Sequence, residues 1–162
     1  AFDGTSNITV LTAGTGISVT GTAVANTGVL SVNGSTGAVT NIAATNAAQS
    51  FTAAQRGTIS ALGNQSGTIT LDFATANNFS MTLNANSTNT LASPSNLTAG
   101  QSGCIYVTQD ATGSRTLAFH ANWDWEGGSA PTLTTTANAT DVIVYSVRTT
   151  GSIFARLLKN FS

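Results

Sequence analysis

Charged residues are scarce in this chain. Five basic and six acidic residues are spread over 162 positions, whereas a typical globular domain is roughly a quarter Asp, Glu, Lys and Arg. Residues 1–109 contain only Asp3, Arg56 and Asp72. Thr, Ser, Asn and Gly take the places of charged side chains, and these residues suit β-ladders, turns and neutral hydrogen-bonding surfaces. This composition favours rigid extracellular β-structure over a cytosolic enzyme.

Other absences narrow the class of protein further. The net charge is −1, so the chain has no basic field with which to neutralise phosphates, and we expect no nucleic-acid partner. No run approaches the roughly 18 apolar residues of a membrane-spanning helix, and no basic segment precedes an apolar one at the start. We therefore expect neither membrane insertion nor a signal peptide. Cys104 is the single cysteine, which excludes an intrachain disulfide, and its apolar neighbours predict a buried thiol. Nothing in the sequence calls for a cofactor.

The first 45 residues consist of short alternating fragments separated by glycine. Ile17–Val19 and Leu30–Val32 are two of these strand-length pieces. Each piece has too few apolar side chains for an independent core, because small isolated β units are marginal in water. Stacking against copies of the same chain would supply the missing burial, so residues 1–45 are predicted to form a self-associating stalk. A flexible Gly- and Thr-rich linker is the alternative that composition leaves open.

Residues 46–63 have a different pattern, which predicts a short helix. One helical face collects the apolar and β-branched side chains of Phe51, Ala54, Thr58, Ile59 and Leu62. Thr52 and Gln55 have the spacing of a capping box, and Gly63 is placed where a left-handed residue would end the helix. We expect this segment to form a helical neck between a stalk and a head.

Residues 64–162 predict a C-terminal β head, with strands separated by turn signals. The expected strands are Thr68–Phe73, Phe79–Leu83, Cys104–Gln109, Arg115–Ala121, Asp141–Arg148 and Ser152–Lys159. Asp110–Ser114 and Thr149–Gly151 are predicted to be hairpin loops. This spacing predicts a mainly β chain whose head is an antiparallel β-sandwich with jelly-roll-like connections. The last strand is apolar on both faces, which suits a position at a subunit interface.

Several blocks resemble the fibre proteins of tailed bacteriophages. VLSVNGSTGAVTNI (Val29–Ile42) resembles segments of trimeric shafts in tail fibres and other adhesive phage proteins. The blocks that resemble phage fibre C-terminal domains follow in order, at Ser50–Leu62, Asn96–Gly103, Thr108–Leu117 and Gly127–Ile143. The resemblance implies a homotrimeric virion protein. It would have a trimeric fibre shaft over residues 1–45, a short helical neck over residues 46–63 and a β head over residues 64–162 that touches the host surface. It also implies contacts with other virion proteins through an N-terminal part that is missing from this sequence.

One local departure from that resemblance is informative. Similar proteins have a proline just before the Gly-Gly of the head block, whereas this chain reads Trp125-Glu126-Gly127-Gly128. The change puts the shape of this loop in doubt. It also suggests that the loop belongs to the individual specificity of the protein.

The densest group of unusual residues lies at positions 119–126. In an extended chain, the period of two places Phe119, Ala121, Trp123 and Trp125 on one face and His120, Asn122, Asp124 and Glu126 on the other. One interpretation makes the tryptophans core and the polar face solvated. The other makes the stretch a sugar site, where amide and carboxylate groups hold hydroxyls and an exposed indole supplies a stacking surface. The tentative ligand-binding residues are His120, Asn122, Trp123, Asp124, Trp125 and Glu126.

Enzymatic and metal-binding alternatives have weaker support from the sequence. Asp124 and Glu126, two apart on a strand, would lie roughly 7 Å from each other, which suits an inverting glycosidase on geometry alone. His120, Asp124 and Glu126 make a weak metal-ligand set, because no cysteine or second histidine accompanies them. No nucleophile-elbow pattern accompanies the histidine. We therefore expect no catalytic and no metal site.

The resulting functional expectation is a non-enzymatic, homotrimeric virion fibre or spike. Its head would mediate attachment to the host cell through a surface glycan or a protein receptor. The alternatives are a capsid-attached head fibre or decoration protein, a capsule-degrading glycan depolymerase, and a cellular trimeric adhesin. The sequence does not separate tail from capsid attachment.

Overall fold

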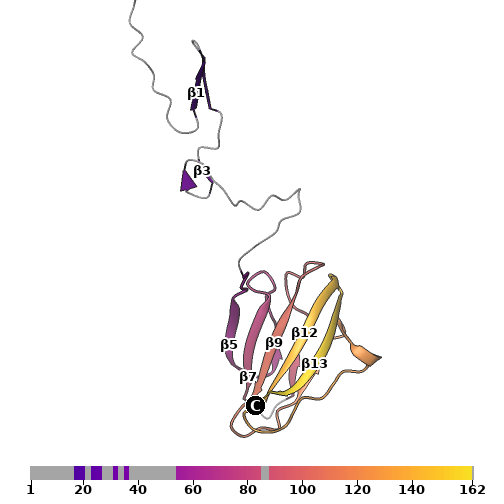
Figure 1. Ribbon diagram of the computed structural model, residues 1–162. Coiled ribbons are helices and arrows are strands. Elements are labelled where there is room, and N and C mark those ends of the chain that lie inside the picture. Colours follow the sequence, from indigo (N-terminus) through magenta and orange to yellow (C-terminus); the bar gives the residue numbers. More distant parts are fainter. Residues whose placement is uncertain are drawn as a thin grey trace, which may run out of the picture. The chain divides into compact units, whose positions relative to one another are not determined.

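The structure, a computed structural model, describes residues 17–20, 23–26, 31–32, 35–36, 54–84 and 88–161 (Figure 1). The chain divides into two compact units, residues 1–54 and 55–162. In the first unit, β1 (Ile17–Thr20) pairs antiparallel with β2 (Ala23–Asn26), and β3 (Ser31–Val32) pairs antiparallel with β4 (Ser35–Thr36). The expected fragment Ile17–Val19 is thus part of a strand, as are Ser31 and Val32 of the second fragment, whose Leu30 lies outside the described residues. The trimeric shaft stays a prediction.

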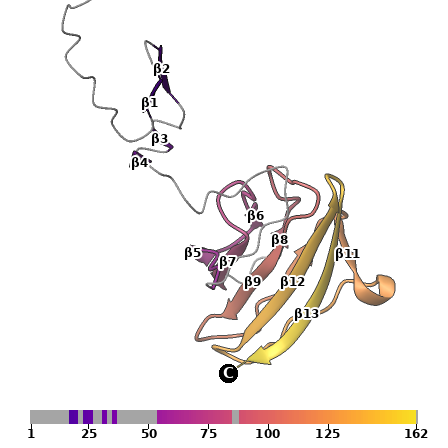
Figure 2. The same ribbon diagram turned by 45° about the horizontal axis from the view of Figure 1, so that its top comes forward.

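The second unit is built from two β-sheets. The six-stranded sheet has the order β11-β13-β12-β9-β7-β5, and the three-stranded sheet has the order β10-β8-β6 (Figure 2). The strands are β5 (Ile59–Gln65), β6 (Thr68–Ile69), β7 (Asn78–Leu83), β8 (Asn89–Leu91), β9 (Ser102–Gln109), β10 (Leu117–Phe119), β11 (Trp123–Trp125), β12 (Thr140–Thr149) and β13 (Ser152–Phe161). A single 3₁₀ turn, η1 (Glu126–Gly128), follows β11.

From β5 to β10 the chain alternates between the two sheets. β5, β7 and β9 are mutually parallel neighbours in the large sheet, and β6, β8 and β10 are parallel neighbours in the small one. The pairs β5–β6, β7–β8 and β9–β10 each place one strand in the large sheet and one in the small sheet. We call each pair a pass, and the three passes together the solenoid. The antiparallel hairpin β12–β13 then extends the large sheet beyond β9, and β11 lies parallel to β13 at its edge.

The mixed strand directions correct the expectation of a mainly antiparallel sandwich. Apolar side chains alternate with a period of two in parallel and antiparallel strands alike, so the pattern does not reveal the direction of pairing. Neighbouring strands pair antiparallel when the chain turns back within one sheet, and parallel when it first crosses to the other sheet and then returns. Asp110–Ser114 was predicted as a hairpin loop but links β9 in the large sheet to β10 in the small sheet. The hairpin at Thr149–Gly151 is confirmed by the pairing of β12 with β13.

The core lies between the two sheets, as expected for a β-sandwich. The large sheet contributes alternate side chains from its central strands, with Phe79, Met81, Leu83, Ile105, Val107, Ile143, Tyr145 and Val147 all buried. Ile69, Leu91 and Leu117 face them from the small sheet. Burying each such side chain contributes about 1.5–3 kcal/mol of hydrophobic stabilisation. Cys104, predicted to be buried, is half-buried, because it alternates with the inward-facing Ile105 on β9.

The helix expected over residues 46–63 is wrong where the structure describes it. Residues 54–58 have no regular structure and β5 begins at Ile59, while residues 46–53 lie outside the described residues. β5 pairs in parallel with β7, and the register of this pairing shifts between Ala61 and Gly63. Gly63 has a φ of +68°. The left-handed glycine thus belongs to a bulge in a strand rather than to a helix end. Pairing with β7 outweighs a weak local preference for helix.

Candidate functional site

The predicted ligand-binding residues lie where the chain passes from the small sheet to the edge of the large one. His120 follows β10, and its backbone N–H donates to the carbonyl of Leu91 (2.9 Å). The Trp123 N–H donates to the carbonyl of His120 (3.0 Å), which closes a turn over residues 120–123. The extended alternation therefore holds only within β11, where successive residues are buried, exposed and half-buried. Ala121, predicted to share the tryptophan face, lies in the turn and is exposed.

Trp123 belongs to the core. Its side chain is 4% exposed, and its indole N–H donates to the carbonyl of Ala92 (3.1 Å). The ring meets Tyr145 edge-on, with 6.3 Å between the centroids. A ligand has almost no access to this indole.

Trp125 has a different environment. It is half-buried and packs edge-on against Phe119, with 4.4 Å between the ring centroids. Its indole Nε1–H is buried and has no hydrogen-bond partner among the described residues. A buried donor without a partner costs about 1–3 kcal/mol, so this N–H is a candidate contact for a water or a ligand.

Intramolecular contacts orient the four polar side chains. The backbone N–H of Asn122 donates to Nδ1 of the exposed His120 (3.2 Å). The amide of Asn122 donates to Ser93 Oγ (2.8 Å). Ser152 Oγ donates to Asp124 Oδ2 (2.5 Å). Arg156 Nε lies 2.9 Å from Glu126 Oε2, and both of these side chains are 67% exposed.

Two hollows meet at β11. The first, about 390 Å³, is lined by His120, Asp124 and Trp125, together with Phe119, Ala121, Trp123, Gly128 and Ala130. The second, about 590 Å³, lies over β12 and β13 and shares only Asp124 and Trp125 with the first. Glu126 lines this second hollow. Three of the predicted residues, His120, Asp124 and Trp125, thus lie around one polar hollow. Within the described ranges, no three His, Cys, Asp or Glu side chains lie close enough together to hold a metal ion.

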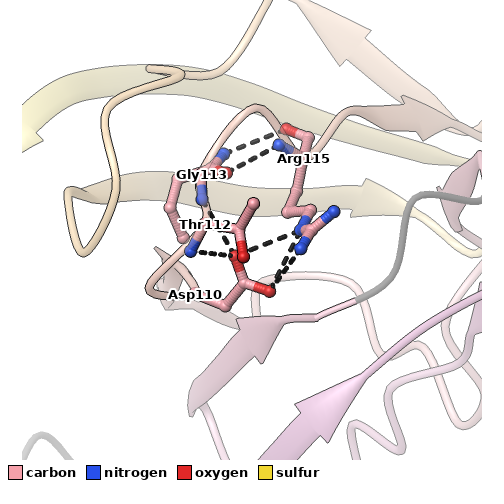
Figure 3. A network of polar contacts seen from close by, with 5 residues as sticks. Asp110, Thr112, Gly113 and Arg115 are labelled. Atoms are coloured by element: carbon pink, nitrogen blue, oxygen red, sulfur yellow. Dashed lines mark hydrogen bonds and ion pairs between the residues drawn. The ribbon is translucent and has the colours of Figure 1, made fainter.

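The loop that follows β9 has a fixed structure that sequence reasoning did not predict. Figure 3 shows the Asp110 carboxylate accepting the backbone N–H groups of Thr112 (3.0 Å) and Gly113 (2.9 Å) and facing the guanidinium of Arg115. Arg115 Nη2 lies 2.7 Å from Asp110 Oδ2, and the arginine side chain is only 7% exposed. The hydrogen bond from Arg115, above all, lowers the pKa of Asp110 from its usual value. The Asp-x-Thr-Gly spacing signals such a turn, but nothing in the sequence signals a buried arginine.

Most of the second unit matches a known protein family. Residues 66–151 match the family described as "Putative phage tail fibre C-terminal domain", which is more than half of the 162 residues. The chain therefore belongs to this family of phage tail fibre domains, and it is a structural component of the virion. No curated protein and no solved structure matched the chain. Over the part of the chain that the structure describes, no helix is long and apolar enough to cross a bilayer.

Proposed function

We propose that the chain is part of a homotrimeric tail fibre whose C-terminal head attaches the phage to a glycan on the host surface. The observation that carries the glycan proposal is the hollow of about 390 Å³ lined by His120, Asp124 and Trp125. Its volume lies within the range of roughly 300–1,000 Å³ typical of small-ligand sites. It combines polar groups with an aromatic side chain, which is the combination that sugars require.

Each of the three side chains has a distinct chemical role in this proposal. The Asp124 carboxylate accepts hydrogen bonds from sugar hydroxyls, and the hydrogen bond from Ser152 holds it in place. The exposed His120 offers its other ring nitrogen to the ligand, since Nδ1 already receives the Asn122 N–H. The half-buried indole of Trp125 supplies an apolar surface for a pyranose ring. Its unpaired N–H supports the proposal, because a ligand oxygen would satisfy it.

Three copies of the head would compensate for weak single-site contacts. A small hollow with a few polar groups favours modest affinity, and linking several such sites raises avidity by roughly 10²–10⁴ without any new contact. The first 45 residues support the trimer, because their short fragments lack enough apolar side chains for a core of their own.

The test is binding of the labelled 162-residue chain to host cells and to purified host surface polysaccharide. We expect Asp124→Asn and Trp125→Phe each to weaken binding at least about tenfold, because the first removes the negative charge and the second removes the indole N–H. Lys159→Ala is the control, since Lys159 is exposed on β13 and lines neither hollow. Unchanged binding in both site variants would move the site elsewhere on the head. A wild-type chain that binds neither cells nor polysaccharide would contradict the attachment function itself.

A further inference from the structure

The outward face of the β12–β13 hairpin exposes large apolar side chains. Val144 is 40% exposed, Phe154 is 51% exposed and Leu158 is 36% exposed. The register brings them together, because Val144 lies opposite Arg156, which stands between Phe154 and Leu158 on the same side of β13. We call these three side chains the hairpin patch. Single exposed apolar residues are ordinary, but a contiguous group of them marks an interaction surface.

The hairpin patch is also concave. Val144, Phe154 and Leu158 line the hollow of about 590 Å³, and Trp125 and Glu126 line it from β11 and η1. In Figures 1 and 2 the η1 turn, drawn in orange, projects beside β13. The surface thus offers an apolar depression with a raised side, a shape that accepts a protruding apolar element of a partner.

The charges around the hairpin patch are balanced. Arg156 pairs with Glu126, and the Arg148 guanidinium lies 5.2 Å from the centroid of the Phe154 ring. Asp124 accepts the hydroxyl of Ser152. Two guanidinium groups thus stand with two carboxylates, so the surface has no net charge that would select a strongly acidic or basic partner. A second copy of the same chain, itself close to neutral at −1, meets this surface without electrostatic repulsion.

We propose that the hairpin patch packs against a second copy of this chain within the fibre. The inference rests on the homotrimer of the proposed function, and it names the surface through which the heads touch. A shaft that joins the copies would hold the heads at millimolar effective concentration, where a small apolar contact is sufficient. Arg156, exposed between Phe154 and Leu158, and its partner Glu126 would then exchange ion pairs between copies.

The experiment combines sedimentation with hydroxyl-radical footprinting of the 162-residue chain. Ile59 is the matched reference, because it is 50% exposed on β5, at the opposite edge of the large sheet from β13. After normalisation to the urea-unfolded chain, we expect Phe154 and Leu158 to be protected at least about fivefold more than Ile59 in the oligomer. Phe154→Glu should raise the concentration at which the oligomer half-dissociates by about tenfold and should remove the extra protection of Leu158, whereas Ile59→Glu should change neither. Circular dichroism confirms that both variants are folded.

The outcomes separate the interface from the trimer. A trimer in which Phe154 and Ile59 are labelled equally overturns the hairpin patch as the interface and leaves the homotrimer standing. A wild-type chain that sediments as a monomer of 16.3 kDa contradicts both. Protection of the patch in a dimer supports contact between copies but contradicts the proposed trimer.

Discussion

Buried polar side chains connect successive passes of the solenoid. Asn89, fully buried at the start of β8, accepts the Gly67 N–H through Oδ1 (3.0 Å) and donates from Nδ2 to the Thr116 carbonyl (3.0 Å). One side chain thus continues the hydrogen bonding of the small sheet across all three passes, beyond the ends of its short strands. Asp141 has a related role, since its carboxylate accepts the backbone N–H groups of Thr134 (2.6 Å) and Asn160 (2.8 Å).

Tyr145 provides a prediction at the same scale. It is 2% exposed and its hydroxyl donates to the Asn77 carbonyl (2.8 Å). Burial raises the pKa of Tyr145 from 10.0 to about 12. The folded state therefore holds this proton more tightly than the unfolded state, so the associated stability is fully present below pH 10 and is lost as the pH rises from 10 towards about 12.

The measurement uses Tyr106→Phe, which leaves Tyr145 as the only tyrosine of the chain. Absorbance at the tyrosinate band should show a midpoint near 12 while the protein stays folded, and Tyr145→Phe should abolish the signal. A midpoint near 10 in the folded protein would contradict the burial of this hydroxyl.

Among the candidate site residues, the two tryptophans show the limits of sequence reasoning. Large aromatic side chains tend to be buried, and Trp123 follows that tendency. Trp125 shares its strand face but lies at the end of β11, at the edge of the sheet, and is only half-buried. A period of two assigns a face to each residue, but it does not reveal where along that face the core ends. The burial of Arg115 could not be predicted either, because it depends on the ion pair with the Asp110 carboxylate.

At the scale of elements, strand positions were more predictable than strand partners. The long apolar alternations of β7, β9, β12 and β13 predict these strands to within two residues at each end. β8 and β11, each only three residues long, give no such signal. β5 is an edge strand with mostly exposed side chains, so its sequence has no strong strand pattern and its conformation depends on β7. Long-range pairing of this kind cannot be read from a local window.

The close approach of β9 to the segment before β7 gives a prediction at this scale. A Cβ built on Gly103 would lie 1.8 Å from the Asn77 carbonyl oxygen and 3.1 Å from the Tyr145 hydroxyl. Because backbone must move to admit a methyl group there, Gly103→Ala is expected to lower the free energy of unfolding by about 1–3 kcal/mol. Gly151→Ala is the control, since its Cβ would meet no atom within 4 Å. Urea unfolding of both variants checks this, and equal stabilities would contradict the described packing of β9.

At the scale of the whole molecule, the buried core that the structure describes lies within residues 55–162. Among the residues whose burial the structure describes, the buried apolar cluster runs from Ile69 to Ala155, within the second unit. We therefore expect a chain truncated to 55–162 to keep the near-ultraviolet circular dichroism of the buried Trp123 and a cooperative urea transition. Trp123→Phe in the same truncated chain identifies the tryptophan signal. Loss of cooperative unfolding on truncation would show that the head depends on the preceding residues.

The solenoid also has a consequence for how the head folds. Its passes are joined by contacts between residues that are close in sequence: Gly67 and Asn89 are 22 residues apart, Asn78 and Cys104 are 26, and Asn89 and Thr116 are 27. Each pass can therefore add to the preceding one by closing a single short loop, whose entropic cost grows only slowly with its length. We therefore expect the solenoid to begin to form while the chain is still being synthesised, before the final hairpin has left the ribosome.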